Sequence, residues 1–179
     1  TVSAGSGLIA NKFTIDARFS RISSDGYVDR ATSSLWSWYT SAAYHGKKTM
    51  IRLNALGGRE RTYQSWWGVP ENLLETDRTY NYYTYKNEVD NYGQDHYQLI
   101  IAHEFDRHWT FNLNGHYTRG KGYYEQQKLG EDLSDYGLEP LIQGMDTAFT
   151  SDLVRRRWLD NHFYGFTYAV NYIGSKVTA

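Results

Sequence analysis

The sequence predicts an all-β fold, an antiparallel up-and-down meander of about six strands within one structural unit spanning residues 1–179. Aromatic residues make up 17% of the chain, with 17 Tyr and 6 Trp, whereas Pro occurs only 2 times. Aromatic and β-branched side chains favour strands. Segments of the chain also alternate between apolar and polar residues, as expected when successive side chains point to opposite faces of a sheet.

The segment NKFTIDARFSR (11–21) shows this alternation most clearly. Its odd positions carry Phe, Ile, Ala and Phe, and its even positions carry Lys, Thr, Asp, Arg and Ser. The same period of two predicts strands at residues 10–22, 35–44, 49–58, 96–105, 109–118 and 162–172. Residues 59–94 and 119–157 lack sustained alternation and are predicted to be long loops.

The connections between these strands alternate in length. HGKK (45–48), FDRHW (105–109) and IGSK (173–176) are short, whereas the others are long. In an up-and-down meander, this order places the short turns at one end of the sheet and the long loops at the other. That asymmetry is typical of outer-membrane barrels.

Each predicted strand has one apolar and one polar face, and this pattern alone permits two environments. In a soluble sandwich the apolar face packs against a core, whereas in a membrane barrel it contacts lipid and the polar face lines the lumen. Strands of about ten residues cross the hydrocarbon layer when tilted. Two groups of residues favour the membrane reading. Charged residues on the polar faces suit a wet lumen, and they are Asp16, Arg18, Arg52 and Glu104. Aromatic residues near strand ends suit the interfacial girdles of a barrel, and they are Trp36, Trp38, Trp109, Tyr117, Trp158, Tyr164 and Tyr172. Because outer-membrane barrels start at about eight strands, a membrane sheet of this size belongs to a larger barrel.

The composition excludes several kinds of site. A formal net charge of −1 and scattered Lys and Arg residues provide no basic surface for nucleic acid. The absence of Cys excludes disulfides, thiolate metal sites and a cysteine nucleophile. His103, Glu104 and His108 lack the spacing of a helical metal site, and no spacing of Ser, His or carboxylates is diagnostic of catalysis. We therefore expect no metal, no cofactor and no enzymatic activity.

The segment RERTYQSWWGVP (59–70) is the best candidate for contact with a ligand. It combines flat aromatic area with hydrogen-bond donors, provided by Arg59, Arg61, Tyr63, Gln64, Trp66 and Trp67. A catecholate or anionic ferric chelate would suit their cation–π and charge-assisted contacts. Packing of the loop onto a neighbouring segment is the alternative, and YNYYTYK (80–86) leaves the same two alternatives open. RRRW (155–158) is interpreted as a solvated loop base, with contact to ligand or to surface lipopolysaccharide as the alternative.

Several runs resemble TonB-dependent outer-membrane receptors, and more closely the barrel of the iron-siderophore-receptor-like members. SRISSDGYVDRA (20–31) and RRRWLDNHFYG (155–165) are the most specific. They belong to a set that covers nearly the whole chain in order: SGLIANKFTIDARFSRISSDGYVDRA (6–31), TYQSWWGVPE (62–71), DNYGQDHYQL (90–99), HYTRGKGYYEQQK (116–128) and DLVRRRWLDNHFYGFTYAVNY (152–172).

This resemblance implies an internal slice of a plugged, roughly 22-stranded barrel in the outer membrane of a Gram-negative bacterium. Such receptors take up a scarce ligand, such as a ferric siderophore or cobalamin, with energy delivered by TonB. The plug and the last strand with its terminal aromatic are expected to lie outside this chain. An isolated slice is expected to self-associate through its open strand edges.

Two other functions stay open at this point. A soluble β-sandwich that binds carbohydrate through its aromatic loops would be monomeric without detergent. An outer-membrane barrel enzyme would need a small closed barrel with a catalytic group facing one end, and the predicted strand number disfavours it.

Overall fold

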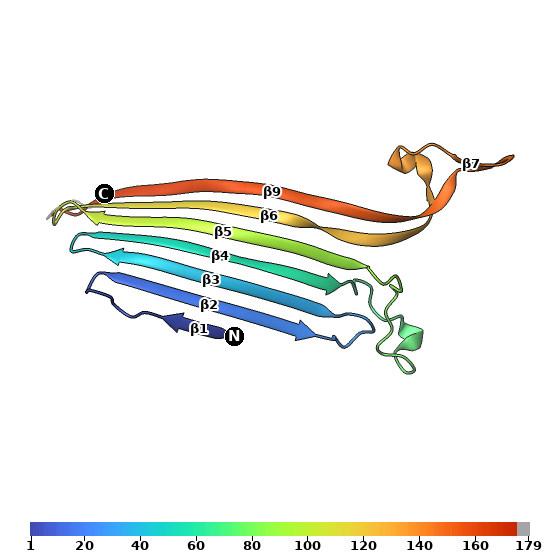
Figure 1. The fold of residues 1–179 in the computed structure, drawn as a ribbon, viewed down its shortest axis with the longest axis horizontal. Helices are drawn as coiled ribbons and strands as arrows, with labels where there is room; N and C mark the ends of the chain where they lie inside the picture. The colour runs from blue at the N-terminus through green and yellow to red at the C-terminus, as the bar shows by residue number, and fades with distance from the viewer. Residues whose placement is uncertain (175–179) are drawn as a thin grey trace.

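The computed structural model describes residues 1–174 and consists mainly of one antiparallel sheet, a single layer in which sequence neighbours lie side by side (Figure 1). Its seven strands are β1 (Val2–Gly5), β2 (Phe13–Ser24), β3 (Ser33–His45), β4 (Thr49–Tyr63), β5 (Val89–Glu104), β6 (Trp109–Asp132) and β9 (Thr150–Tyr172). A separate hairpin and two 3-10 turns complete the fold: β7 (Leu141–Gln143), β8 (Asp146–Ala148), η1 (Glu71–Leu73) and η2 (Leu133–Tyr136). The predicted all-β meander is confirmed, with seven strands in the large sheet rather than about six.

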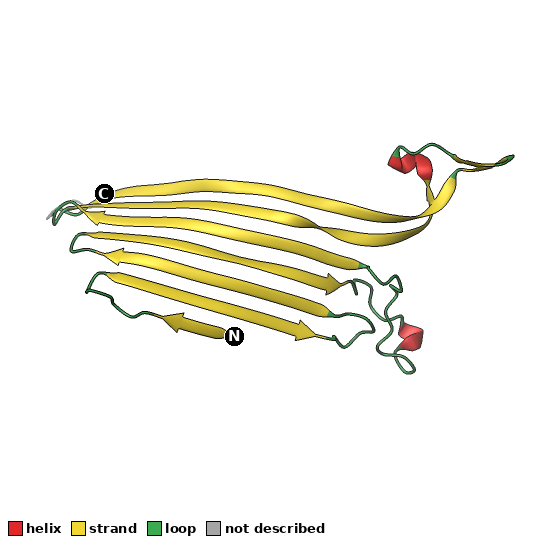
Figure 2. Cartoon of the chain, in the orientation of Figure 1, coloured by secondary structure: helices red, strands yellow, loops and turns green. Residues whose placement is uncertain are grey.

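The alternation of connection lengths is also confirmed. The turns at 46–48 and 105–108 are short and lie at one end of the sheet, whereas the loops at 25–32, 64–88 and 133–149 lie at the other (Figure 2). We call these the turn end and the loop end. The connection predicted at 173–176 lies partly outside the described residues.

The strand register places most apolar residues of the turn-end half on one face, which we call the outer face. One cross-strand row shows this, and it runs Phe13, Tyr44, Ile51, Ile101, Leu113 and Tyr168. The opposite inner face is polar, since Asn54 donates to Gln98 over 3.1 Å and accepts from the hydroxyl of Tyr39.

The outer face has no protein layer on it. Phe13 is 48% exposed, Ile51 37% and Phe166 70%. The total accessible surface is 13002 Å², against roughly 9,000 Å² expected for a compact monomer of this mass. The buried apolar residues of the described chain are few: Ala43, Tyr63, Val89 and Leu133. The sheet therefore lacks a core of its own, and its apolar side chains need another apolar phase.

The sandwich alternative is not supported. A sandwich needs two packed sheets, and the second sheet within residues 1–174 is only the hairpin of β7 and β8. Within the same residues, no helix is both long and apolar enough to span a bilayer.

The outer face changes character part of the way along the strands. From the turn end, an apolar band extends between two aromatic rows, Trp109 with Tyr172 and then Tyr97, Tyr117 and Tyr164. Trp109 and Tyr172 pack with ring centroids 4.8 Å apart, and Tyr97 and Tyr117 stack at 6.1 Å. Beyond the second row, toward the loop end, the outer face carries ionic side chains.

The predicted loops at 59–94 and 119–157 were too long. β4 continues to Tyr63, β5 begins at Val89, β6 reaches Asp132 and β9 begins at Thr150. Past the second aromatic row the outer face of β4, β5, β6 and β9 carries charged residues, so the hydrophobic period is lost while the ladder of hydrogen bonds continues. β1 was missed because it has only four residues and no alternating pattern.

A β-bulge interrupts the hairpin of β6 and β9 near the loop end. The register shifts between Lys128 and Glu131, and Gly130 adopts a φ of 63° there. Its backbone N–H donates to the Asp152 carboxylate over 2.9 Å. Glycine suits this left-handed conformation, which is a common way to bend one strand of a pair. Beyond the bulge, η2 and the β7–β8 hairpin project from the sheet (Figure 1).

Candidate functional site

The loop at 64–88 is held against the sheet by buried polar groups. The hydroxyl of Tyr63 donates to the carbonyls of Tyr83 and Tyr85 over 3.1 and 2.7 Å. The buried side-chain amide of Asn81 donates to the carbonyls of Asp29 and Gln64. These bonds give the loop a defined conformation although it contains little regular structure.

A second anchor comes from the loop at 25–32. The guanidinium of Arg30 donates to the carbonyls of Asn81 and Tyr83, each over 3.0 Å. Arg30 itself has a φ of 63°, an uncommon conformation for a residue other than glycine. The two loops are therefore joined into one layer at the loop end.

The loop layer lies beside an exposed edge of β6. Pairing of β5 with β6 ends at Asp90 and Tyr124, so the part of β6 beyond Tyr124 has no strand on that side. The carboxylate of Glu88 accepts the backbone N–H of Gln127 over 3.0 Å and satisfies one donor of this edge. An open cavity of about 790 Å³ lies between the loop and β6.

Aromatic side chains of the loop form one wall of this cavity. Trp66 makes edge contacts with Tyr83 and Tyr124, at centroid distances of 6.4 and 5.9 Å. Trp67 packs on Tyr82 at 6.1 Å. Both Trp rings are more than half exposed. Their exposed faces offer flat apolar area, and the contacts with neighbouring rings hold them in place.

The opposite wall is polar and comes from β6. Gln126, Gln127, Lys128 and Glu131 contribute to it. Lys128 lies 3.6 Å from the Glu131 carboxylate, which also accepts the hydroxyl of Tyr136 over 2.7 Å. The cation of this wall is thus partly balanced by a carboxylate.

Two buried carboxylates, Glu88 and Glu125, lie at the base of the loop, and their pKa values are shifted in opposite directions. Burial raises the pKa of the Glu88 carboxyl. Burial acts in the same sense on Glu125, but hydrogen bonds from Tyr85 (2.7 Å) and Arg156 (2.5 Å) outweigh it and lower the pKa of the Glu125 carboxyl. The hydrogen bond that the Tyr85 hydroxyl donates to Glu125 also raises the pKa of the Tyr85 phenol. Both carboxylates lie outside the apolar band.

The six residues selected from the sequence fall into three places. Trp66 and Trp67 line the cavity. Tyr63 and Gln64 lie beneath the loop, and the side-chain amide of Gln64 is buried with no hydrogen-bond partner among the described residues. Arg59 lies on the outer face of β4, and Arg61 donates to the Asn87 side chain over 3.2 Å. The structure therefore separates the arginines from the tryptophans.

Sequence reasoning missed the partners that β6 and β9 supply. Tyr124 touches Trp66, and the guanidinium of Arg157 lies 5.9 Å from the Tyr124 ring and donates to its hydroxyl over 3.0 Å. Arg155, on the same face as Arg157, donates to Gln126 over 2.8 Å. The RRRW segment is therefore part of a strand with ordered contacts rather than a solvated loop base.

Two further findings bear on the chemistry of the site. Within residues 1–174, no group of three or more His, Cys, Asp or Glu side chains is arranged to hold a metal ion. The cavity combines stacking area with hydrogen-bonding groups, an arrangement suited to binding a planar ligand.

No protein-family model and no curated protein sequence matches this chain. Among solved structures, it is similar to the open form of the ferric-catecholate import receptor Fiu from E. coli K12, with a TM-score of 0.65 and 13% identity. The match to the closed form of Fiu has a TM-score of 0.63 and 14% identity. Each match covers 95% of this chain, but only 30% and 28% of the Fiu chains.

The likeness is one of fold. This chain has the architecture of a barrel segment, with a sheet that is not closed, and it spans less than a third of the receptor that it matches.

Proposed function

We propose that this chain is a segment of the barrel of a TonB-dependent receptor in the outer membrane of a Gram-negative bacterium. The observation that carries the proposal is the exposed apolar band on a sheet without a core. Lipid is the apolar phase that would cover it, and the aromatic rows at its two borders match the girdles of membrane barrels. The likeness in fold to Fiu supports the same assignment.

The open edges of β1 and β9 fit this proposal. Each of these strands has only one partner in the large sheet. Unpaired edges are not tolerated in lipid, so further strands of the same barrel would cover them. The energy for uptake would come from TonB through a plug domain outside this chain.

We further propose a ferric siderophore with catechol rings as the ligand of the cavity at 64–88. Fiu is described as a receptor for ferric catecholates, and Trp66, Trp67 and Tyr82 would offer such rings edge and stacking contacts. The role is binding and uptake, with no catalytic step. Because Glu88 and Glu131 partly balance Lys128, the cavity favours flat rings over a compact anion.

The test uses the protein encoded by the complete gene, in outer-membrane vesicles, with a ferric catecholate complex as the probe. Trp66→Ala should weaken binding of the complex roughly tenfold, because one aromatic contact is lost. Trp109→Ala, at the turn end of β6, is the matched control and should leave binding unchanged. Equal affinity of the Trp66→Ala variant and the parent would contradict the assignment of the site.

Replacing residues 65–87 with a short linker separates ligand binding from assembly. The flanking Tyr63 and Val89 belong to strands, so the barrel should still form and remain heat-modifiable on gels while ferric catecholate binding is lost. Binding that survives this replacement would exclude the loop as the ligand contact.

A further inference from the structure

Glu88 holds a carboxylate at the base of the cavity that the loop at 64–88 forms with β6. It is the last residue before β5, and it lines the cavity although only 2% of its surface is exposed. Its backbone is fixed on both sides, because its carbonyl accepts the N–H of Gln64 over 2.8 Å and its N–H donates to the carbonyl of Tyr85 over 3.2 Å. The loop layer therefore sets the position of this carboxylate.

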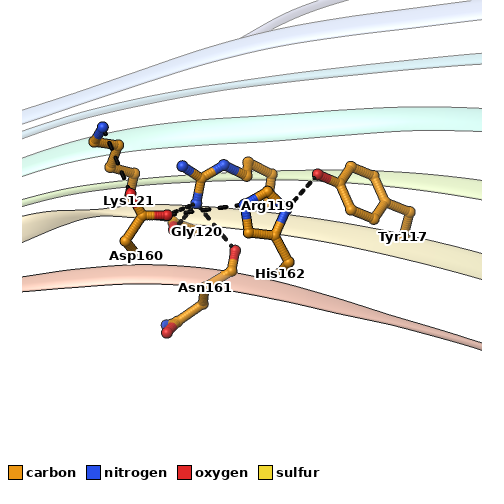
Figure 3. Close-up of polar contacts among 7 residues, drawn as sticks. All are labelled: Tyr117, Arg119, Gly120, Lys121, Asp160, Asn161 and His162. Carbon is orange, nitrogen blue, oxygen red and sulfur yellow. Dashed lines mark hydrogen bonds and ion pairs between the residues drawn. The ribbon is translucent and has the colours of Figure 1, made fainter.

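Glu88 differs from paired carboxylates nearby in having no cation against it. Asp160 on the outer face, for example, is paired with Arg119 across β6 and β9 (Figure 3). Within residues 1–174, Glu88 makes no ion pair, and its carboxylate accepts a hydrogen bond from the backbone N–H of Gln127 over 3.0 Å. The carbonyl oxygen of a protonated carboxyl can accept this bond as well. The contacts of Glu88 therefore do not require it to be charged.

The charged and titratable groups that face Glu88 come from β4, the loop and β6. Lys128 and Glu125 of β6 act on its charge in opposite senses, and the phenols of Tyr63 and Tyr83 lie close enough to interact with it electrostatically. Burial outweighs the hydrogen bond from the backbone and the attraction of Lys128, so the pKa of the Glu88 carboxyl is raised. A further negative charge nearby would add to this effect.

The ligand proposed for this cavity supplies such a charge. Catechol oxygens lose their protons when they bind iron, and in a complex in which catecholates fill the coordination sphere their charge exceeds that of the ferric ion. Binding would bring this anion close to the buried Glu88 carboxylate, where water screens charges weakly. Like charges in such a site disfavour each other, and the weaker acid takes up a proton.

We propose that Glu88 takes up a proton when a ferric catecholate binds and stays neutral in the complex. The proton comes from the solvent and adds to a carboxylate oxygen, and the bonds within the chelate do not change. Neutral Glu88 removes a repulsive charge from the cavity while the contact with Gln127 persists. Glu88 is thus a specificity residue, because it makes the affinity for an anionic ligand depend on pH but not the affinity for a neutral aromatic one. This inference rests on the proposed function, since it requires the chelate to occupy this cavity.

The direction of the pH dependence follows from linkage. The bound anion raises the pKa of Glu88 above its value in the free protein, so binding takes up protons only between these two values. Affinity for the chelate should be constant below this window and constant again above it. Within the window, affinity should fall by up to about tenfold per pH unit as pH rises, because at most about one proton is taken up per chelate.

The test counts the protons taken up per chelate bound by the purified complete protein. Calorimetric titrations with the ferric complex of a synthetic tris-catecholamide chelator, run in buffers of different ionisation enthalpy, give this number. Glu88→Gln keeps an acceptor for the N–H of Gln127 but carries no charge. It should lose the proton uptake of the parent, and at the high-pH end of the window it should bind the chelate up to about tenfold more tightly than the parent.

Glu131→Gln is the matched control, because Glu131 is a second carboxylate on the wall of the same cavity. The hydroxyl of Tyr136 donates to it over 2.7 Å and Lys128 lies 3.6 Å away, and these contacts lower the pKa of the Glu131 carboxyl. Glu131 is therefore ionised with and without the chelate. Its replacement should leave the number of protons taken up at the parental value.

One further measurement needs no variant. A protonated carboxyl has an infrared carbonyl band that a carboxylate lacks, so the unaltered protein should gain this band when the chelate binds. Absence of the band overturns the inference. Equal proton uptake by the parent and Glu88→Gln overturns it as well, whereas tighter binding by Glu88→Gln at high pH supports it and is not a result that misfolding produces.

Two outcomes separate this inference from the proposed function. A protein that binds the chelate in the cavity without proton uptake at Glu88 contradicts only the role of Glu88. A protein that inserts into vesicles as a heat-modifiable barrel but binds no ferric catecholate contradicts the proposed ligand, and this inference with it.

Discussion

The turn-end and loop-end halves of β5, β6 and β9 form one continuous ladder but differ in what stabilises their outer faces. In the turn-end half, Ile101, Leu113 and Tyr168 form an apolar row with no protein over it. In the loop-end half, Asp95 pairs with Arg59 of β4, and Arg119 of β6 pairs with Asp160 of β9, so the ion pairs join neighbouring strands. Strand pairing therefore continues across a boundary at which the outer face changes from apolar to ionic. The backbone pairing is the same on both sides of this boundary, and only the side chains of the outer face differ.

The most severe test of this difference places a charge in the apolar band. Leu53→Arg should reduce the free energy of unfolding in bilayers by about 2–4 kcal/mol, because an arginine near the bilayer midplane is costly. Denaturant unfolding in vesicles measures it. Leu53 is 56% exposed, so the same substitution in a protein surrounded by water would be nearly neutral.

Ser23→Arg is the matched control for Leu53→Arg. Ser23 is exposed near the loop end of β2, on the same face as the apolar band but beyond it. Its free energy of unfolding should change by no more than about 0.5 kcal/mol. Equal effects of the two substitutions would remove the distinction between the halves.

A smaller effect is expected from the loop layer. Tyr63→Phe removes a donor to two carbonyls, those of Tyr83 and Tyr85. Each carbonyl keeps a second donor, Arg30 for Tyr83 and the backbone N–H of Glu88 for Tyr85. The loss of the Tyr63 hydroxyl should therefore destabilise the loop by only about 0.5–1.5 kcal/mol. Limited proteolysis at 64–88 should accelerate, while heat-modifiability of the barrel stays unchanged.

Tyr27→Phe serves as the control for the loop layer, since Tyr27 lies in the neighbouring loop and is 71% exposed. Proteolysis of 64–88 should proceed at the parental rate in this variant. Unfolding of the whole sheet by Tyr63→Phe would show that the loop is not a separate layer.

The smallest effect is a pH dependence confined to the loop end. The pKa of Glu88 is raised in the folded protein, so its contribution favours the ordered loop at low pH and is lost as pH rises through the folded pKa. The pKa of Glu125 is lowered, so its contribution is present at neutral pH and is lost as pH falls through its folded pKa. Loop order should therefore be greatest between these two transitions.

Two amide variants separate the two transitions. Glu88→Gln should remove the loss of order at higher pH, and Glu125→Gln should remove the loss at lower pH. Proteolysis rates at 64–88, measured across pH, report both. A profile that neither variant alters would show that other groups control the loop.

The turn-end half of the sheet could be predicted from the sequence because its strands carry apolar side chains on one face and polar side chains on the other. Phe13, Ile51 and Leu113 fall on the expected face, and the order of short and long connections follows directly. The loop-end extensions could not be predicted, since Arg59, Asp95 and Arg119 replace apolar residues on the outer face and erase the alternation.

The candidate site was predictable only in part. Trp66 and Trp67 stand out because adjacent tryptophans in a long loop have no strand pattern to explain them. Arg59 and Arg61 belong to the outer face because they continue the odd positions of Ile51 and Leu53, a parity that the predicted loop boundary concealed. Tyr124 could not be assigned, because its meeting with Trp66 depends on where β5 stops pairing with β6.

The bulge at Gly130 acts as an elbow in the long hairpin. β6 has one extra residue between Lys128 and Glu131 relative to β9, and the hairpin bends there. The segment beyond this bend is therefore set off from the regular ladder nearer the turn end. Insertions or deletions in the tip at 133–149 can therefore accumulate without shifting a single cross-strand partner nearer the turn end. The loop at 133–149 can therefore change in sequence and length, and with it in binding specificity, while the strands below keep their register.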